Sequence, residues 1–134
     1  MTMNQLNILF YETANEKLTI EVFYEDETFW LSQKKMAELF GVEVNTINYH
    51  LKEVFRSKEL GEDSVIRNFR ITAADNKKYN TKFYNLDAII SVGYRVNSAQ
   101  ATQLRIWATN TLKEYNGEKI NEIRVLHNSV FLLN

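Results

Sequence analysis

Residues 33–52 read QKKMAELFGVEVNTINYHLK and contain the clearest structural signal of the sequence. Ser32 stands before it as an N-cap, and Gly41 ends the first helix because glycine adopts the left-handed conformation without strain. A second helix begins at Val44 or Asn45. Two short helices joined by a glycine turn predict a helix–turn–helix at the centre of the domain.

Apolar residues recur at helical spacing on both sides of the glycine. A small residue, Ala37, precedes Gly41 by four positions and lets the second helix approach closely. Val42 would help to hold the two helices at a steep angle. The apolar positions expected to face the core are Met36, Leu39, Phe40, Ile47, Leu51, Val54 and Phe55.

The outward face of the second helix predicts contacts with duplex DNA. A helix in this position lies in the major groove, where asparagine pairs with adenine, threonine touches the thymine methyl group, and lysine reaches guanine or phosphate. Glu43 and Glu53 oppose this interpretation because they repel phosphate. The predicted DNA-binding residues on these helices are Lys34, Lys35, Asn45, Thr46, Asn48, Tyr49, Lys52 and Arg56.

Two β-hairpins are predicted around the helices. Residues 18–24 and 28–31 flank an acidic turn and are expected to form the first hairpin, and residues 7–11 are expected to add a strand before it. Residues 64–72 alternate well and return as residues 79–84 after a basic turn. A short helix is then expected over 86–92 and a longer one over 99–115. These elements together make the fold class α+β.

Charge is unevenly spread along this chain of 134 residues with a formal net charge of −1. Residues 1–31 hold six acidic residues and one lysine, whereas residues 64–115 hold eight basic and three acidic residues. The basic segment is either an electrostatic footprint for phosphate or a scatter of surface cations. Charge alone leaves both interpretations open.

Several classes of protein are excluded by composition. The chain has no cysteine and only two histidines, which excludes a disulfide scaffold, a thiol nucleophile and a Cys-ligated zinc site. No apolar run approaches the ~20 residues that span a bilayer, and the first ten residues lack the pattern of a secretory signal. We therefore expect a cytoplasmic protein without a metal, a cofactor or a membrane contact.

The sequence resembles the RhuM family of virulence-associated bacterial proteins. The resemblance covers about residues 3–115 and rests on FWLSQKKMAELFGVEVNTINYHLKEVF and on KFYNLDAIISVGYRVNSAQATQLRIWATNTLKEY. The arrangement is also similar to the amino-terminal BRO-N and KilA-N domains of phage antirepressors, in which Arg105-Ile106-Trp107 matches an R-x-W core. The resemblance implies a DNA-binding protein of a mobile element or pathogenicity island that regulates transcription. It also makes the basic hairpin a wing, with Arg67, Arg70, Lys77, Lys78 and Lys82 as further DNA-binding residues.

The end of the chain departs from this family pattern. We expect one domain over residues 1–116 and a tail of uncertain structure over 117–134, which does not look like the helical continuation of family members. The tail is therefore expected to be truncated or altered relative to the family. Its apolar end, residues 130–133, favours a homodimer contact.

The main alternative to DNA binding is a protein-interaction module that holds a host or phage protein, for which the acidic residues 21–27 are the best support.

An enzyme is not expected because the sequence has no P-loop, G-x-S-x-G or H-E-x-x-H motif. Asp87, Arg95 and Arg105 are interpreted as ion pairs between two helices.

Overall fold

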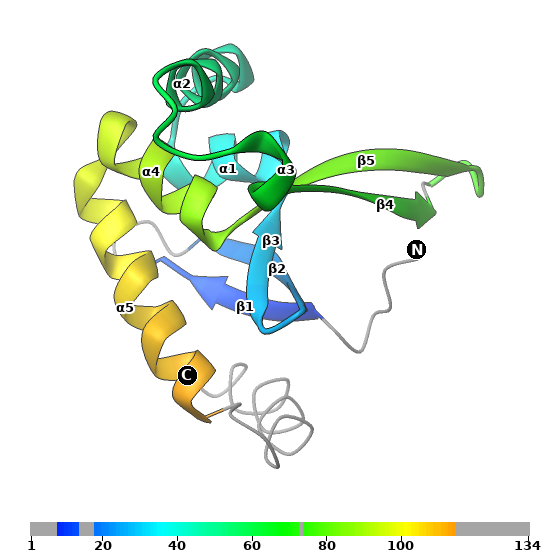
Figure 1. Cartoon of the computed structure of the whole chain (residues 1–134). Helices are drawn as coiled ribbons and strands as arrows, with labels where there is room; N and C mark the ends of the chain where they lie inside the picture. The colour runs from blue at the N-terminus through cyan, green and yellow to red at the C-terminus, as the bar shows by residue number, and fades with distance from the viewer. Residues whose placement is uncertain (1–7, 14–17, 73, 115–134) are drawn as a thin grey trace.

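The protein is an α+β domain in which helices cover one face of a five-stranded antiparallel sheet (Figure 1). The computed structural model describes residues 8–13, 18–72 and 74–114. The expected α+β class is confirmed. The predicted tail over 117–134 lies outside the described residues.

The sheet has the strand order β1-β2-β3-β5-β4. Its strands, in chain order, are β1 (Ile8–Glu12), β2 (Thr19–Glu25), β3 (Thr28–Leu31), β4 (Ile66–Thr72) and β5 (Lys78–Asn85). Asp26 and Glu27, both with positive φ, form the two-residue turn between β2 and β3, a conformation that matches the twist of a paired hairpin. The pairing of Leu31 with Tyr84 joins β3 to β5, so the two β-regions form one sheet.

The helices are α1 (Gln33–Phe40), α2 (Val44–Arg56), α3 (Glu62–Val65), α4 (Leu86–Val96) and α5 (Ser98–Glu114). Ser32 caps α1 by accepting a hydrogen bond from the Lys35 amide, as its position before the helix predicts. Gly41 follows α1 with φ of 70°, in the left-handed conformation expected for a helix stop. The four-residue helix α3 was not predicted, because one helical turn is too short to show a period.

One large core lies between the sheet and the helices. Ile47, Leu51 and Val54 of α2 are all at most 2% exposed, in agreement with the predicted apolar face. Gly93 of α4 makes a close approach possible, since a Cβ atom there would lie 2.6 Å from Phe40 and 2.8 Å from Ala101. The helices α1, α4 and α5 therefore meet at a position that only glycine fits.

A second, smaller cluster lies on the other face of the sheet. It consists of Trp30, Phe69 and Phe83, with Phe23 and Ile71 packed against it. The rings meet edge to face at centroid distances of 5.0 to 5.8 Å. This cluster anchors the base of β4 and β5, whose outer part projects away from the helices as an arm (Figure 1).

Candidate nucleic-acid interface

The residues predicted to bind DNA fall into separate regions of the structure. The first region is α2, where Asn45, Tyr49, Lys52 and Arg56 follow one another at helical spacing and are all exposed. Tyr49 is the most exposed large apolar residue of the described chain, at 59%. These four side chains form one outward stripe along α2.

Two other predicted residues of α2, Thr46 and Asn48, are half-buried at the margin of this stripe. The amide oxygen of Asn48 accepts a hydrogen bond from Nε2 of Gln33 at 3.3 Å, and the same nitrogen donates to the hydroxyl of Tyr84 at 3.0 Å. Asn48 therefore helps to join α1, α2 and β5. To pair with a base, it would have to give up this contact.

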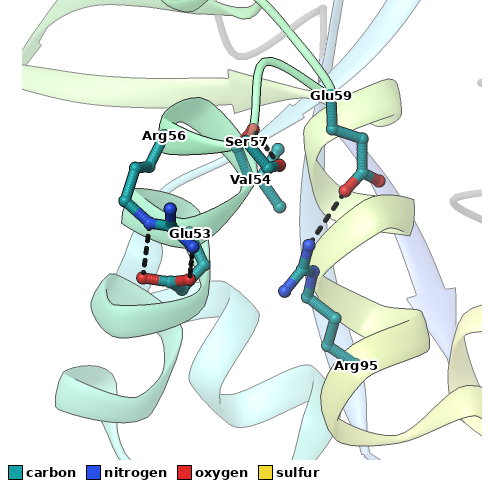
Figure 2. A network of polar contacts seen from close by, with 6 residues as sticks. All are labelled: Glu53, Val54, Arg56, Ser57, Glu59 and Arg95. Atoms are coloured by element: carbon teal, nitrogen blue, oxygen red, sulfur yellow. Dashed lines mark hydrogen bonds and ion pairs between the residues drawn. The ribbon is translucent and has the colours of Figure 1, made fainter.

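The only cation of α2 in an ion pair within the described structure is Arg56 (Figure 2). Its guanidinium group lies 2.6 Å from the Glu53 carboxylate and makes a second hydrogen bond at 3.2 Å. The hydrogen bond to Arg56 is the main reason that the pKa of Glu53 is lowered, and the same bond raises the pKa of Arg56. Glu53 therefore stays charged and neutralises the last turn of α2.

The predicted ion pairs among Asp87, Arg95 and Arg105 are wrong in their partners. Arg95 of α4 binds Glu59, in the loop after α2, at 3.0 Å (Figure 2). Arg105 of α5 donates a hydrogen bond to the Tyr94 hydroxyl at 3.0 Å, and this bond is the largest cause of a lowered Tyr94 pKa. Both arginines join neighbouring elements of the fold.

The second region is the arm formed by β4 and β5, and its two faces differ sharply. The register pairs Asn68 with Lys82, Arg70 with Asn80, and Thr72 with Lys78. Paired residues of an antiparallel ladder point to the same side, so these six side chains share one face. All six are exposed, and none is acidic. We call this surface the polar face of the arm.

The polar face lies on the same side of the sheet as the helices. Tyr84 and Ile66 continue its alternation toward the base of the arm, and both pack in the main core. Within the described residues, Arg70, Lys78 and Lys82 form no ion pair of 4.0 Å or less. The arm therefore presents three uncompensated cations beside the helix-covered half of the molecule.

Arg67 belongs to the opposite face. Its guanidinium group stands 4.7 Å from the centre of the Trp30 ring and forms an ion pair with Asp26. Alternation along 65–71 already places Arg67 with Phe69 and apart from Arg70, so the sequence held this signal. The same alternation along the two strands places Asn68, Thr72 and Asn80 on the polar face with Arg70, and the sequence-based prediction did not name these three residues.

The remaining predicted residues lie apart from both surfaces. Lys34 borders a shallow depression beside the turn between α1 and α2, lined in part by Leu18 and Val44. Lys35 lies 3.8 Å from Glu38 and borders a cavity of about 220 Å³ beside Phe83. These two lysines therefore face different openings.

The turn at the tip of the arm carries Lys77. The backbone amide of Lys77 donates to the Asp75 carboxylate at 2.9 Å, and the Tyr79 hydroxyl donates to the same carboxylate at 2.6 Å. The bond from Tyr79 is the main cause of a lowered Asp75 pKa, and it raises the pKa of Tyr79. These bonds order the tip and leave the Lys77 side chain exposed.

Neither a metal site nor a membrane span is found in the described part of the chain. No group of three or more His, Cys, Asp or Glu side chains is placed to hold a metal ion there. No helix in that part is long and apolar enough to cross a bilayer.

Comparison with known proteins identifies a family model that matches part of the chain. The searches of curated proteins and of solved structures found no match. The model of the Virulence protein RhuM family matches residues 64–128, which include the arm, α4 and α5. The match continues past residue 115, where the resemblance was expected to end, and it does not include the helices α1 and α2. Over residues 64–128 the chain carries the sequence pattern of the RhuM virulence protein family, and the predicted resemblance to that family is confirmed.

Proposed function

We propose that this protein binds duplex DNA, using the polar face of the arm and the adjoining surface of the helices. The observation that carries the proposal is the polar face itself, with three cations, two asparagines and one threonine in a regular array that contains no acid. Cations attract the phosphate backbone, while asparagine, threonine and arginine are suited to base edges. Clustering on one face favours the phosphate footprint over a scatter of surface lysines.

The helix pair supports the same proposal in a secondary role. The sequence pattern around Gly41, which joins α1 and α2, is similar to that of a DNA-binding helix–turn–helix, and we include it as support. The stripe of α2 adds Asn45, Lys52 and Arg56 to the exposed polar surface. The resemblance to phage antirepressor domains leads us to propose regulation of transcription as the cellular role. A homodimer remains part of the proposal, to be checked by light scattering.

Fluorescence anisotropy with a mixed-sequence duplex tests this function. Binding is expected at ~50 mM salt and should weaken severalfold or more at ~200 mM, because phosphate contacts release counterions. The variant Arg70→Gln/Lys78→Gln/Lys82→Gln should lose most of this affinity. Lys113→Gln, on an exposed position of α5, is the control for charge and should bind as the wild type does. Absence of binding at low salt would contradict DNA binding.

A protein-interaction module is the second candidate. It is favoured by exposed apolar surface on α2, where Val44 is 42% and Tyr49 59% exposed. This function predicts no salt-dependent DNA binding. It also predicts that Tyr49→Ala weakens a complex with a partner protein, whereas Arg70→Gln/Lys78→Gln/Lys82→Gln leaves the affinity for that partner unchanged.

A further inference from the structure

The arm has the shape and chemistry of an element that reads bases. The polar face holds three cross-strand pairs: Asn68–Lys82, Arg70–Asn80 and Thr72–Lys78. Successive pairs on one face lie two residues apart, or roughly 6.8 Å at ~3.4 Å per residue. This distance equals about two base-pair steps of ~3.4 Å. The three pairs therefore match a run of about five base pairs.

A two-stranded ribbon fits the major groove of B-form DNA. Its strands lie roughly 4.8 Å apart, and the groove is about 12 Å wide. The outer part of β4 and β5 projects away from the helices, so this end of the ribbon is free to enter a groove (Figure 1). The major groove of A-form RNA is deep and narrow, which excludes the same approach to duplex RNA.

The residue types on the polar face are those that recognise bases directly. Arg70 and Asn80 stand opposite each other at its centre. An arginine can donate two hydrogen bonds to O6 and N7 of guanine, and an asparagine can bond both N6 and N7 of adenine. Lys78 and Lys82 lie on either side of this pair along β5, where ammonium groups can reach phosphates.

The ribbon is also held in place before any ligand arrives. Phe69 is fully buried beneath it, and Arg67 lies over Trp30 on the side away from the polar face. The tip is closed by the bonds of Asp75 to Tyr79 and Lys77. A preordered ribbon loses little conformational entropy on binding, which favours selective contacts.

The other candidate for base contacts, α2, has fewer polar side chains that are not already engaged. Asn48 is engaged by Gln33, Arg56 is paired with Glu53, and Glu43 stands exposed before the first turn. Its exposed stripe therefore keeps one asparagine, Asn45, and one uncompensated lysine, Lys52, within the described structure.

We propose that the polar face of the β4–β5 arm lies in the major groove of duplex DNA and makes the base-specific contacts, with Arg70 and Asn80 at its centre, while α2 supports the complex from outside the groove. This inference rests on the proposed DNA-binding function. It adds the element that reads the sequence, the groove that it enters, and the bases that it selects.

The experiment begins with selection of preferred duplexes from a random pool by the full chain. The affinities of wild type, Arg70→Lys, Asn80→Ala and Asn45→Ala are then measured on the selected duplex and on an unrelated duplex. Arg70→Lys keeps the charge and removes the bidentate geometry. It should lower the ratio of the two affinities by about tenfold or more, with unrelated-duplex binding nearly unchanged. Asn80→Ala should have a similar effect on the ratio, whereas Asn45→Ala should leave it within about twofold of wild type.

Replacing the selected guanines with 7-deazaguanine removes the N7 acceptor from the major groove alone. This change should weaken wild-type binding and have little further effect on Arg70→Lys, because both remove the same contact. Circular dichroism of each variant confirms that the chain is folded. The two substitutions act at different positions of the arm, so misfolding of one leaves the other as a test.

Two results would overturn the inference while leaving DNA binding intact. One is an unchanged affinity ratio in both arm variants together with its loss in Asn45→Ala, which would make α2 the reader. The other is equal binding of duplex RNA and DNA of the selected sequence. Failure of the wild-type chain to bind any duplex at ~50 mM salt would overturn the proposed function as well.

Discussion

The arm and α2 carry similar residues and use them differently. Both contain asparagine, lysine and arginine on exposed positions, and both were predicted to contact DNA. In α2 the neighbouring residues Glu53 and Gln33 engage Arg56 and Asn48. On the polar face of the arm, alternation sends the apolar residues and Arg67 to one side and leaves cations and amides together on the other. Two surfaces of similar composition therefore differ in how far their polar side chains are engaged by neighbours within the described structure.

Truncation of a buried side chain in either region should have the largest effect, which is a loss of folding stability. Phe69→Ala should cost about 3–5 kcal/mol, because it empties a fully buried position in the small cluster beneath the arm. Hydrogen exchange should rise in β4 and β5 far more than in α2. Ile47→Ala, which removes a fully buried residue of α2, should cost about 2–5 kcal/mol and raise exchange in α2. Equal rises in both regions after Phe69→Ala would mean that the arm does not open separately.

Removal of positive charge should have a different effect on the salt dependence of DNA binding in the two regions. Lys78→Gln/Lys82→Gln should reduce the slope of log affinity against log salt by about 2, because each lost phosphate contact contributes ~0.9. Lys52→Gln/Arg56→Gln on α2 removes the same formal charge. It should change the slope by less than 1, since Arg56 is already neutralised by Glu53. A larger change from the α2 variant would reverse the assignment of the two surfaces.

The sequence predicted local structure well and relations between side chains poorly. The helices at 33–40 and 44–56 follow from Ser32, Gly41 and the spacing of the apolar residues, and the strands follow from alternation. The neighbouring positions of β3 and β5 join residues more than fifty positions apart, which no local pattern encodes. The bond from Gln33 to Asn48 depends on the angle between two helices and was likewise beyond the sequence.

A smaller effect on DNA affinity is expected when the acidic residue Glu53 of α2 is neutralised. Glu53→Gln releases Arg56 and raises the positive charge of the helix. If α2 stays outside the groove, affinity for a mixed duplex should increase only about two- to threefold through long-range attraction. An increase of tenfold or more in the same anisotropy titration would make α2 a main contact surface for the duplex and not a support outside the groove.

The smallest effects concern two carboxylates, one in each region. Arg56→Gln should raise the pKa of Glu53, and Tyr79→Phe should raise the pKa of Asp75, because each removes the hydrogen bond that lowers it most. A carboxylate whose pKa is lowered in the folded state stabilises the protein at a pH above its unfolded pKa, and this contribution is lost as the pH falls through the lowered folded pKa. Carboxyl carbon chemical shifts followed during an acid titration measure both changes. An unmoved Asp75 pKa in Tyr79→Phe would show that the tyrosine does not order the tip.

An NMR titration of the isotope-labelled chain with a short selected duplex tests directly whether the polar face of the arm lies in the major groove. Signals of Arg70, Asn80 and their neighbours on β4 and β5 should shift most and show contacts to base protons of the major groove. Signals of Asn45 and Lys52 on α2 should shift less and show no such contacts. Contacts between base protons and α2, with the arm unaffected, would show that α2 and not the arm enters the groove.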